Sequence, residues 1–334
     1  MATSGHIPVL LQPVVDLLTL TGQEHTGGVF ADCTAGLGGH AVHIAARLGP
    51  TGSVILNDLD AGNLARAAEA AHAAVPGITI LTHAGNFASL PRFIASHGLR
   101  ATCVLADLGF ASTQVDNPAR GLSFMHDGPL DMRLDPAGPV TAADLVATMT
   151  EQQLVQTIAE FGEEKHPKPI ARRIVQARQQ AAITTTAQLA SIIRSALAGK
   201  PTGGIDPATR TFQALRIAVN DELGNLDALL DEISAGARAL QPPGSTHTGP
   251  RTEWLAPGAR VGIISFHSLE DRPVKHTFAN LVKAGLARYV IKDPLGPTDD
   301  EQRTNPRSRS AKLRGIQITS NDSGPSGAKG CSHG

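Results

Sequence analysis

Short apolar runs alternate with helix-like segments along the first 110 residues of the chain. Four apolar runs have the length and bounds of strands: 28–32, 53–60, 78–81 and 102–107. Between these runs, apolar side chains recur at helical spacing over 42–48, 63–74 and 90–97. Strand–helix alternation at this spacing predicts an α/β fold with a doubly wound parallel sheet.

A different pattern begins after residue 107. Residues 116–139 are rich in Gly, Pro and Asp, which is typical of loops. Helical spacing follows, and Thr150 and Gln153 stand at the distance of a capping box at one helix start. We therefore predict an inserted helical domain over 116–208, which is a candidate substrate-recognition domain.

The sheet-forming pattern returns after this insertion. Apolar side chains from Phe212 to Ile233 step by three or four residues, which predicts one long amphipathic helix. Further strands are predicted at 261–266, 288–292 and 313–319. The sheet domain is therefore expected to cover 1–115 and 209–320, and the Gly/Ser-rich segment 321–334 is expected to be disordered.

A glycine cluster separates the first predicted strand from the first predicted helix. Gly36, Gly38 and Gly39 follow Asp32, and such glycines let backbone N–H groups approach a ligand closely. The spacing also fits a dinucleotide fingerprint, so a dinucleotide-binding protein is one alternative and a purely structural turn is another. The carboxylate of Asp32 suits a cationic group, such as the amine of S-adenosylmethionine (SAM), better than a pyrophosphate.

Acidic residues end three of the predicted strands: Asp32, Asp58 and Asp107. In doubly wound sheets, ligands bind outside the carboxyl ends of the strands. One strand-terminal acid could be a helix cap or chance. Three acids beside one glycine turn favour a binding site.

Composition narrows the class of protein. The chain has 334 residues, is 41% hydrophobic and carries a net charge of −1, so a polyanionic partner would need a local basic patch. The three cysteines lack the spacing of a zinc site or a disulfide framework. The chain has no signal-peptide pattern and no apolar run approaching 18 residues, which predicts a cytoplasmic protein without membrane contact.

Basic residues gather in the predicted insertion. Between residues 165 and 216, nine Lys and Arg residues accompany a single acid, Asp206. A solvated helical face is one explanation, and a phosphate-facing surface is another. Residues 303–312 are also basic and contain no acid. On the second explanation, the candidate RNA contacts are Arg172, Arg173, Arg210, Arg216, Arg307 and Arg309.

Together these blocks closely resemble the bacterial RsmH (MraW) family, whose members transfer methyl from SAM to N4 of a decoding-site cytosine in 16S rRNA. The resemblance covers nearly the whole chain up to about residue 320. The matching stretches are Asp32-x-Thr-x-Gly-x-Gly38-Gly39-His40, Asp107-Leu-Gly109, Arg120-Gly-x-Ser-Phe-Met125, Asp127-Gly-Pro-Leu-Asp-Met-Arg133, Gly162-Glu-Glu164, Pro207-Ala-Thr-Arg-Thr-Phe-Gln-Ala214-x-Arg216, Ile263-Ile-Ser-Phe-His-Ser-Leu-Glu-Asp-Arg272 and Asn305-Pro-Arg307.

The resemblance implies a seven-strand SAM-dependent methyltransferase domain, Rossmann-like, with an inserted helical domain. It implies SAM as the cofactor and 16S rRNA in the small ribosomal subunit as the partner, while the oligomeric state stays open between monomer and homodimer. The cofactor contacts that it carries over are Gly38, Gly39, His40, Asp58, Phe87, Asp107 and Gln114.

The chemistry expected of such a site needs few groups, because the sulfonium of SAM is already activated. The protein has to align the amine, the methyl group and the sulfur, and to accept polarity from the amine. The candidate catalytic residues are Asp107, Ser112 and His267. His267 and Ser268 follow the fifth predicted strand, where they either face the target base or form only a structural turn.

The chain also departs from the family pattern. Phe110-Ala-Ser-Thr113 stands where the family usually has Val-Ser-Ser-Pro, and Lys165-His-Pro-Lys-Pro169 should shift a helix start because it contains two prolines. Residues 241–254 look like a loop insertion. Two other functions remain open: a SAM methyltransferase acting on DNA or another RNA amine, and a non-catalytic dinucleotide-binding protein.

Overall fold

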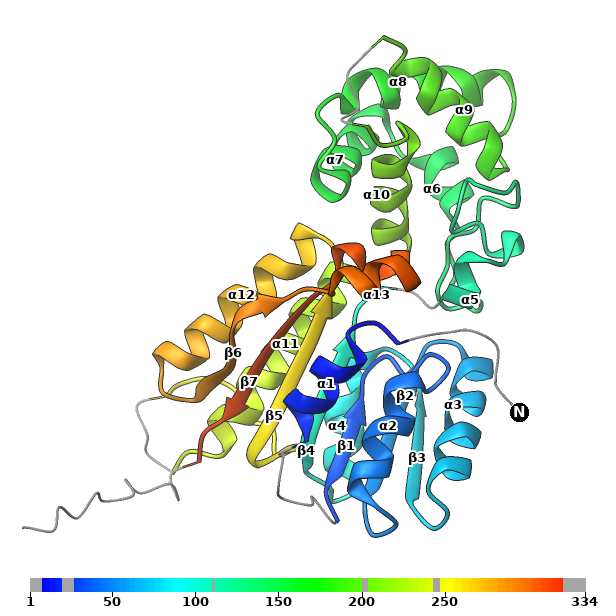
Figure 1. Ribbon diagram of the computed structural model, residues 1–334. Coiled ribbons are helices and arrows are strands. Elements are labelled where there is room, and N and C mark those ends of the chain that lie inside the picture. Colours follow the sequence, from blue (N-terminus) through cyan, green and yellow to red (C-terminus); the bar gives the residue numbers. More distant parts are fainter. Residues whose placement is uncertain (1–7, 20–26, 110–111, 200–203, 243–246, 321–334) are drawn as a thin grey trace, which may run out of the picture. The chain divides into compact units, whose positions relative to one another are not determined.

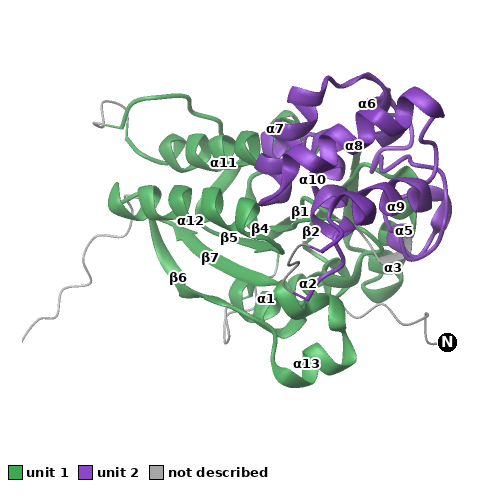
Figure 2. Ribbon diagram, turned by 90° about the horizontal axis from the view of Figure 1, so that it is seen from above, with its two compact units in different colours: residues 1–109, 226–334 green, residues 110–225 purple. Residues whose placement is uncertain are grey.

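The computed structural model describes residues 8–19, 27–109, 112–199, 204–242 and 247–320. Their contacts group the chain into unit 1, residues 1–109 and 226–334, and unit 2, residues 110–225 (Figure 2). The predicted insertion over 116–208 lies inside unit 2, which extends beyond it at both ends. The segment predicted to be disordered, 321–334, lies outside the described residues.

Unit 1 is built on a seven-stranded sheet in the order β3-β2-β1-β4-β5-β7-β6 (Figure 1). The first five strands of this order are parallel, β7 is antiparallel to β5, and β6 is antiparallel to β7. The parallel sheet predicted from the sequence is therefore confirmed, with a reversed pair at one edge. The strands are β1 (Val29–Asp32), β2 (Ser53–Asp58), β3 (Thr79–Ala84), β4 (Ala101–Asp107), β5 (Leu255–Ser265), β6 (Ala287–Leu295) and β7 (Lys312–Ile318).

Helices cover both faces of this sheet. Successive strand residues point to opposite faces, so Phe30 packs into one core with α1, α2 and α3, whereas Val29 and Ala31 enter another with α4, α11 and α12. This arrangement is the doubly wound fold. The helices of unit 1 are α1 (Leu11–Leu18), α2 (Gly39–Leu48), α3 (Ala61–Ala74), α4 (Leu90–Ser96), most of α11 (Glu222–Ala239), α12 (Ser268–Lys283) and α13 (Asp299–Thr304).

Unit 2 packs its helices around an apolar core of its own. A capping box starts α7, where Thr150 and Gln153 each bond the other's backbone, as predicted. Helix α8 starts at Pro167. Proline is tolerated at this position because the first N–H groups of a helix have no partner within the helix, so the missing N–H costs no hydrogen bond. The helices are α5 (Ser112–Val115), α6 (Ala142–Thr148), α7 (Glu151–Gly162), α8 (Pro167–Gln180), α9 (Thr186–Ala196) and α10 (Ala208–Asn220).

The prediction of one long helix through Phe212 and Ile233 is wrong. Asp221 interrupts it with φ 47°, in the left-handed region, so α10 ends at Asn220 and α11 begins at Glu222. Asn220 stabilises the break, because its side chain accepts from Leu134 N and donates to the carbonyl of Met132. The apolar spacing survives the break, so the sequence pattern does not show it.

Candidate functional site

Three acids end neighbouring parallel strands of unit 1. Asp32 ends β1, and in the sheet register it lies beside Leu56 of β2 and Leu105 of β4. Asp58 and Asp107 end those two strands. The structure therefore brings the three predicted acids to the same edge of the sheet.

The turn after β1 requires its glycines. Gly38 has φ 83°, and a Cβ on it would lie 2.9 Å from the Cα of Ala67. A Cβ on Gly39 would lie 2.6 Å from the Cγ of Pro8. Gly36 has φ 51° and donates its N–H to Asp58 Oδ2 at 2.8 Å. The turn therefore presents backbone without side chains, directly beside an oriented carboxylate.

Burial raises the pKa of these acids. Asp32 is 2% exposed, and burial raises its pKa to about 7, a shift that the Thr34 N–H reduces and the charge of Asp58 increases. Burial also raises the pKa of Asp58, which hydrogen bonds from the N–H groups of Asp60 and Gly36 oppose. The site therefore gathers carboxyl groups that lose their protons less readily than exposed ones.

Asp107 is also buried, and two other acids act on it. Its pKa is raised well above the ordinary value by burial first, then by the charges of Asp32 and Glu270. Its Oδ1 is buried and has no hydrogen-bond partner among the described residues. An acid in this state is suited to a ligand group that brings a donor or a positive charge.

His40 stands at the start of α2 and faces two oxygen atoms. Its Nε2 lies 2.9 Å from the carbonyl oxygen of Val9, and its Nδ1 lies 3.8 Å from Asp107 Oδ2. The residue is 7% exposed. It is therefore anchored on one side and directed at Asp107 on the other.

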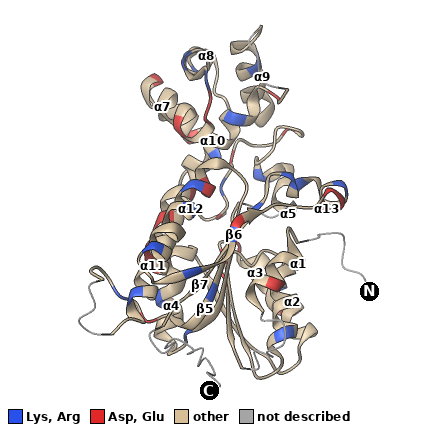
Figure 3. Ribbon diagram, turned by 60° about the vertical axis from the view of Figure 1, so that its left-hand side comes forward, with Lys and Arg blue, Asp and Glu red and all other residues tan. Residues whose placement is uncertain are grey.

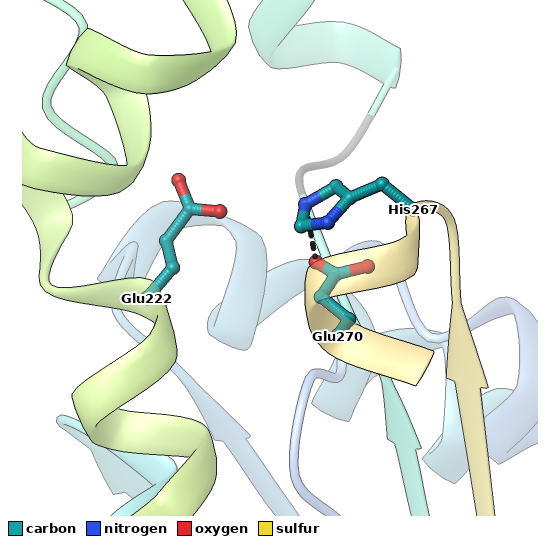
Figure 4. A group of neighbouring side chains, drawn as sticks. All are labelled: Glu222, His267 and Glu270. Atoms are coloured by element: carbon teal, nitrogen blue, oxygen red, sulfur yellow. Dashed lines mark ion pairs between the residues drawn. The ribbon is translucent and has the colours of Figure 1, made fainter. Parts of the chain in front are cut away.

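His267 precedes α12, and its imidazole lies beside the carboxylate of Glu270 (Figure 4). Glu270 Oε1 lies 3.2 Å from His267 Nε2, and Glu270 Oε2 accepts the N–H of Phe266 at 2.8 Å. Sequence reasoning missed Glu270, although its position three residues after a candidate catalytic histidine was a usable signal. Glu222, drawn in the same figure, belongs to unit 2 and pairs there with Arg216.

The remaining candidate cofactor and catalytic residues are spread over both units. Phe87 opens a short 3-10 turn of unit 1 (Phe87–Ser89) and packs partly buried against its core. Gln114 lies in α5 of unit 2 and is 9% exposed. Ser112 begins that helix. Phe110 and Ala111, the start of the altered loop, lie outside the described residues.

The candidate RNA contacts differ in how far acids already engage them. Arg216 pairs with Glu222 at 2.8 Å, and the two side chains are only 13% and 11% exposed. Arg210 lies 3.7 Å from the buried Glu164. Figure 3 marks basic residues on α8 and α9. The exposed candidates are Arg172 and Arg173 on α8 of unit 2, and Arg307 and Arg309 on a 3-10 turn (Pro306–Ser310) of unit 1. Arg172 lies 3.8 Å from Glu151, and its side chain is still 70% exposed.

A sheet in this strand order with β7 reversed, carrying a bare glycine turn and acids at three strand ends, is that of a SAM-dependent methyltransferase. The position of Asp58 beside the glycine turn and the buried Oδ1 of Asp107, which has no hydrogen-bond partner among the described residues, fit a cationic donor of this kind. The chain belongs to the MraW methylase family, whose model matches residues 3–245 and 247–319.

Relatives match over nearly the full length of both chains. Each carries the name "Ribosomal RNA small subunit methyltransferase H". The protein from Desulfosudis oleivorans is 41% identical over 330 residues, covering 93% of this chain and 98% of its own. The protein from Symbiobacterium thermophilum is 40% identical, covering 93% and 96%. The protein from Solibacter usitatus is 41% identical, covering 94% and 99%.

Proposed function

We propose that this methyltransferase acts on N4 of a decoding-site cytosine in the 16S rRNA of the small ribosomal subunit. The substrate assignment is supported by the near full-length similarity to proteins named as small-subunit rRNA methyltransferases. An amine target agrees with the acid that ends β4, because a carboxylate can accept a hydrogen bond from the amine that is methylated. The target base has to be unpaired or flipped to reach such a site.

Each candidate cofactor and catalytic residue has a proposed role. When bound, SAM supplies an activated methyl group on a positively charged sulfur. Asp58 accepts from the ribose hydroxyls, and Phe87 packs on the adenine. The backbone at Gly38 and Gly39, with His40 and Gln114, completes the cofactor site. The residues proposed to orient the target amine and to handle its proton are Asp107, Ser112 and His267.

A methylation assay tests the substrate. Isolated small ribosomal subunits, naked 16S rRNA and duplex DNA are each incubated with the protein and labelled SAM, and the modified nucleoside is identified by mass spectrometry. We expect N4-methylcytidine in the ribosomal RNA at a single position and none in DNA. Methylation of DNA, or of a different RNA amine, would instead support the alternative substrate classes.

The exposed arginines of α8 are proposed to bind phosphate. Replacing both Arg172 and Arg173 by Gln should lower the slope of log affinity against log salt by about 1.4, because each lost single-strand contact removes about 0.7. SAM affinity should not change. The control is Arg194→Gln on α9, since Arg194 is already paired with Asp206 at 2.8 Å. Equal salt slopes for wild type and the double variant would show that α8 is only a solvated face.

We expect the protein to work in the cytoplasm, where its proposed substrate is assembled. Among the described residues, no helix has both the length and the apolar composition that a membrane span requires.

A further inference from the structure

His40 and Asp107 lie close enough to interact through their charges, with 3.8 Å between Nδ1 and Oδ2, which is longer than a hydrogen bond. A carbonyl oxygen can only accept, so the His40 nitrogen that lies 2.9 Å from Val9 O, Nε2, carries hydrogen. A neutral His40 therefore presents the lone pair of Nδ1 to Asp107 Oδ2, 3.8 Å away. An ionised carboxylate also only accepts, so the two groups attract each other only when one of them holds a proton.

The other charges acting on Asp107 favour retention of that proton. Asp32 comes from β1 and Glu270 from the first turn of α12, and both raise the pKa of Asp107, as does its burial. Asp58 acts on Asp32 in the same direction. A nearby positive charge would favour the ionised form of each of these acids.

We propose that the Asp107–His40 pair holds one proton in the donor-free protein, that the sulfonium charge of SAM expels it, and that Asp107 afterwards takes a proton from the methylated amine. The last step rests on the proposed function, whereas the first two concern only SAM binding. The positive charge of SAM thus determines when Asp107 is deprotonated and can act as a base.

The transfer step balances with these groups alone. The nitrogen–carbon bond forms, the carbon–sulfur bond breaks with its electron pair returning to sulfur, and one proton leaves the nitrogen for Asp107. Because the sulfur loses its charge in the same step, the proton affinity of Asp107 rises when the amine must be deprotonated. The pair ends the reaction holding one proton, as it began.

Calorimetry with SAM and S-adenosylhomocysteine tests this inference without any RNA. The two ligands share the amino and carboxyl groups and differ in the charge at sulfur. Binding heats measured near pH 7 in buffers of different ionisation enthalpy give the number of protons released. We expect SAM to release up to one proton more than S-adenosylhomocysteine. The ratio of the two affinities should then shift toward SAM by up to about tenfold per pH unit as pH rises.

Variants identify the group that holds the proton. Asp107→Asn should make proton release equal for the two ligands. Asp16→Asn, an exposed acid on α1, should leave the difference intact. Equal release in the wild type, or a difference that persists in Asp107→Asn, would overturn the inference. The wild-type comparison needs no variant to fold. If the protein did not bind SAM, the assignment of SAM as methyl donor would be wrong. If it methylated RNA but released equal numbers of protons with the two ligands, only this inference would be overturned.

Discussion

Asp107→Asn should slow single-turnover methylation of small ribosomal subunits about ten- to a hundredfold at saturating SAM. The change keeps the shape of the side chain and one acceptor oxygen but removes its charge. A hydrogen bond to a charged group is worth roughly 1.5–3 kcal/mol, and a bond formed mainly in the transition state affects turnover. Near pH 7 we expect little loss of SAM affinity. In the wild type, the attraction between Asp107 and the sulfonium is offset by the cost of expelling the proton that the Asp107–His40 pair holds.

The matched control for this variant is again Asp16→Asn, which makes the same chemical change on an exposed helix face. SAM calorimetry on both proteins separates binding from chemistry. If Asp107→Asn keeps its turnover at saturating SAM and instead binds SAM more weakly, Asp107 serves only the cofactor and is not a catalytic residue.

Asp58→Ala should weaken SAM binding about ten- to a hundredfold, the second large effect that we expect. The N–H groups of Gly36 and Asp60 donate to the two oxygens of Asp58, each at 2.8 Å, so the carboxylate that we propose binds the ribose hydroxyls is fixed in position. Removing it loses a charge-assisted hydrogen bond to the ligand, worth roughly 1.5–3 kcal/mol. The measurement is calorimetry with SAM, with NAD as the comparison ligand, for which we expect no binding.

A neighbouring acid provides the control for Asp58. Asp60 caps α3 by accepting from the N–H groups of Gly62 and Asn63, and Asn is an equally good cap. Asp60→Asn should therefore leave SAM affinity and thermal stability unchanged. Wild-type SAM affinity in Asp58→Ala would remove Asp58 from the cofactor site, and tight NAD binding would favour the dinucleotide-binding alternative.

The sheet edge could be predicted from the sequence because its signals are local. A buried strand is a short apolar run, and an acid at its end, such as Asp32 or Asp107, is visible without knowledge of the fold. The parallel order then brings the strand ends together. The glycine turn after the first strand was also visible in the sequence, and the positive φ at Gly38 explains why few other residues fit there.

What the sequence could not show depends on the backbone conformation and on which side chains it brings into contact. Glu270 was not singled out from the sequence, although it lies three residues after His267. In the fold its Oε2 accepts the N–H of Phe266, and its Oε1 lies 3.2 Å from His267 Nε2. The break at Asp221 leaves the apolar period intact. A count of basic residues likewise treats Arg216 as available, although it is bound to Glu222.

The division of unit 1 into two chain segments has a consequence for the order of folding during synthesis. β4 ends at Asp107, and the strand that pairs with its free side, β5, begins only at Leu255. Unit 2 lies between them and has its own core, so it can fold while β4 still exposes an unpaired edge. Such an edge is a template for wrong pairing between nascent chains. The β4 edge stays open to such partners until β5 (Leu255–Ser265) has been synthesised and has left the ribosome.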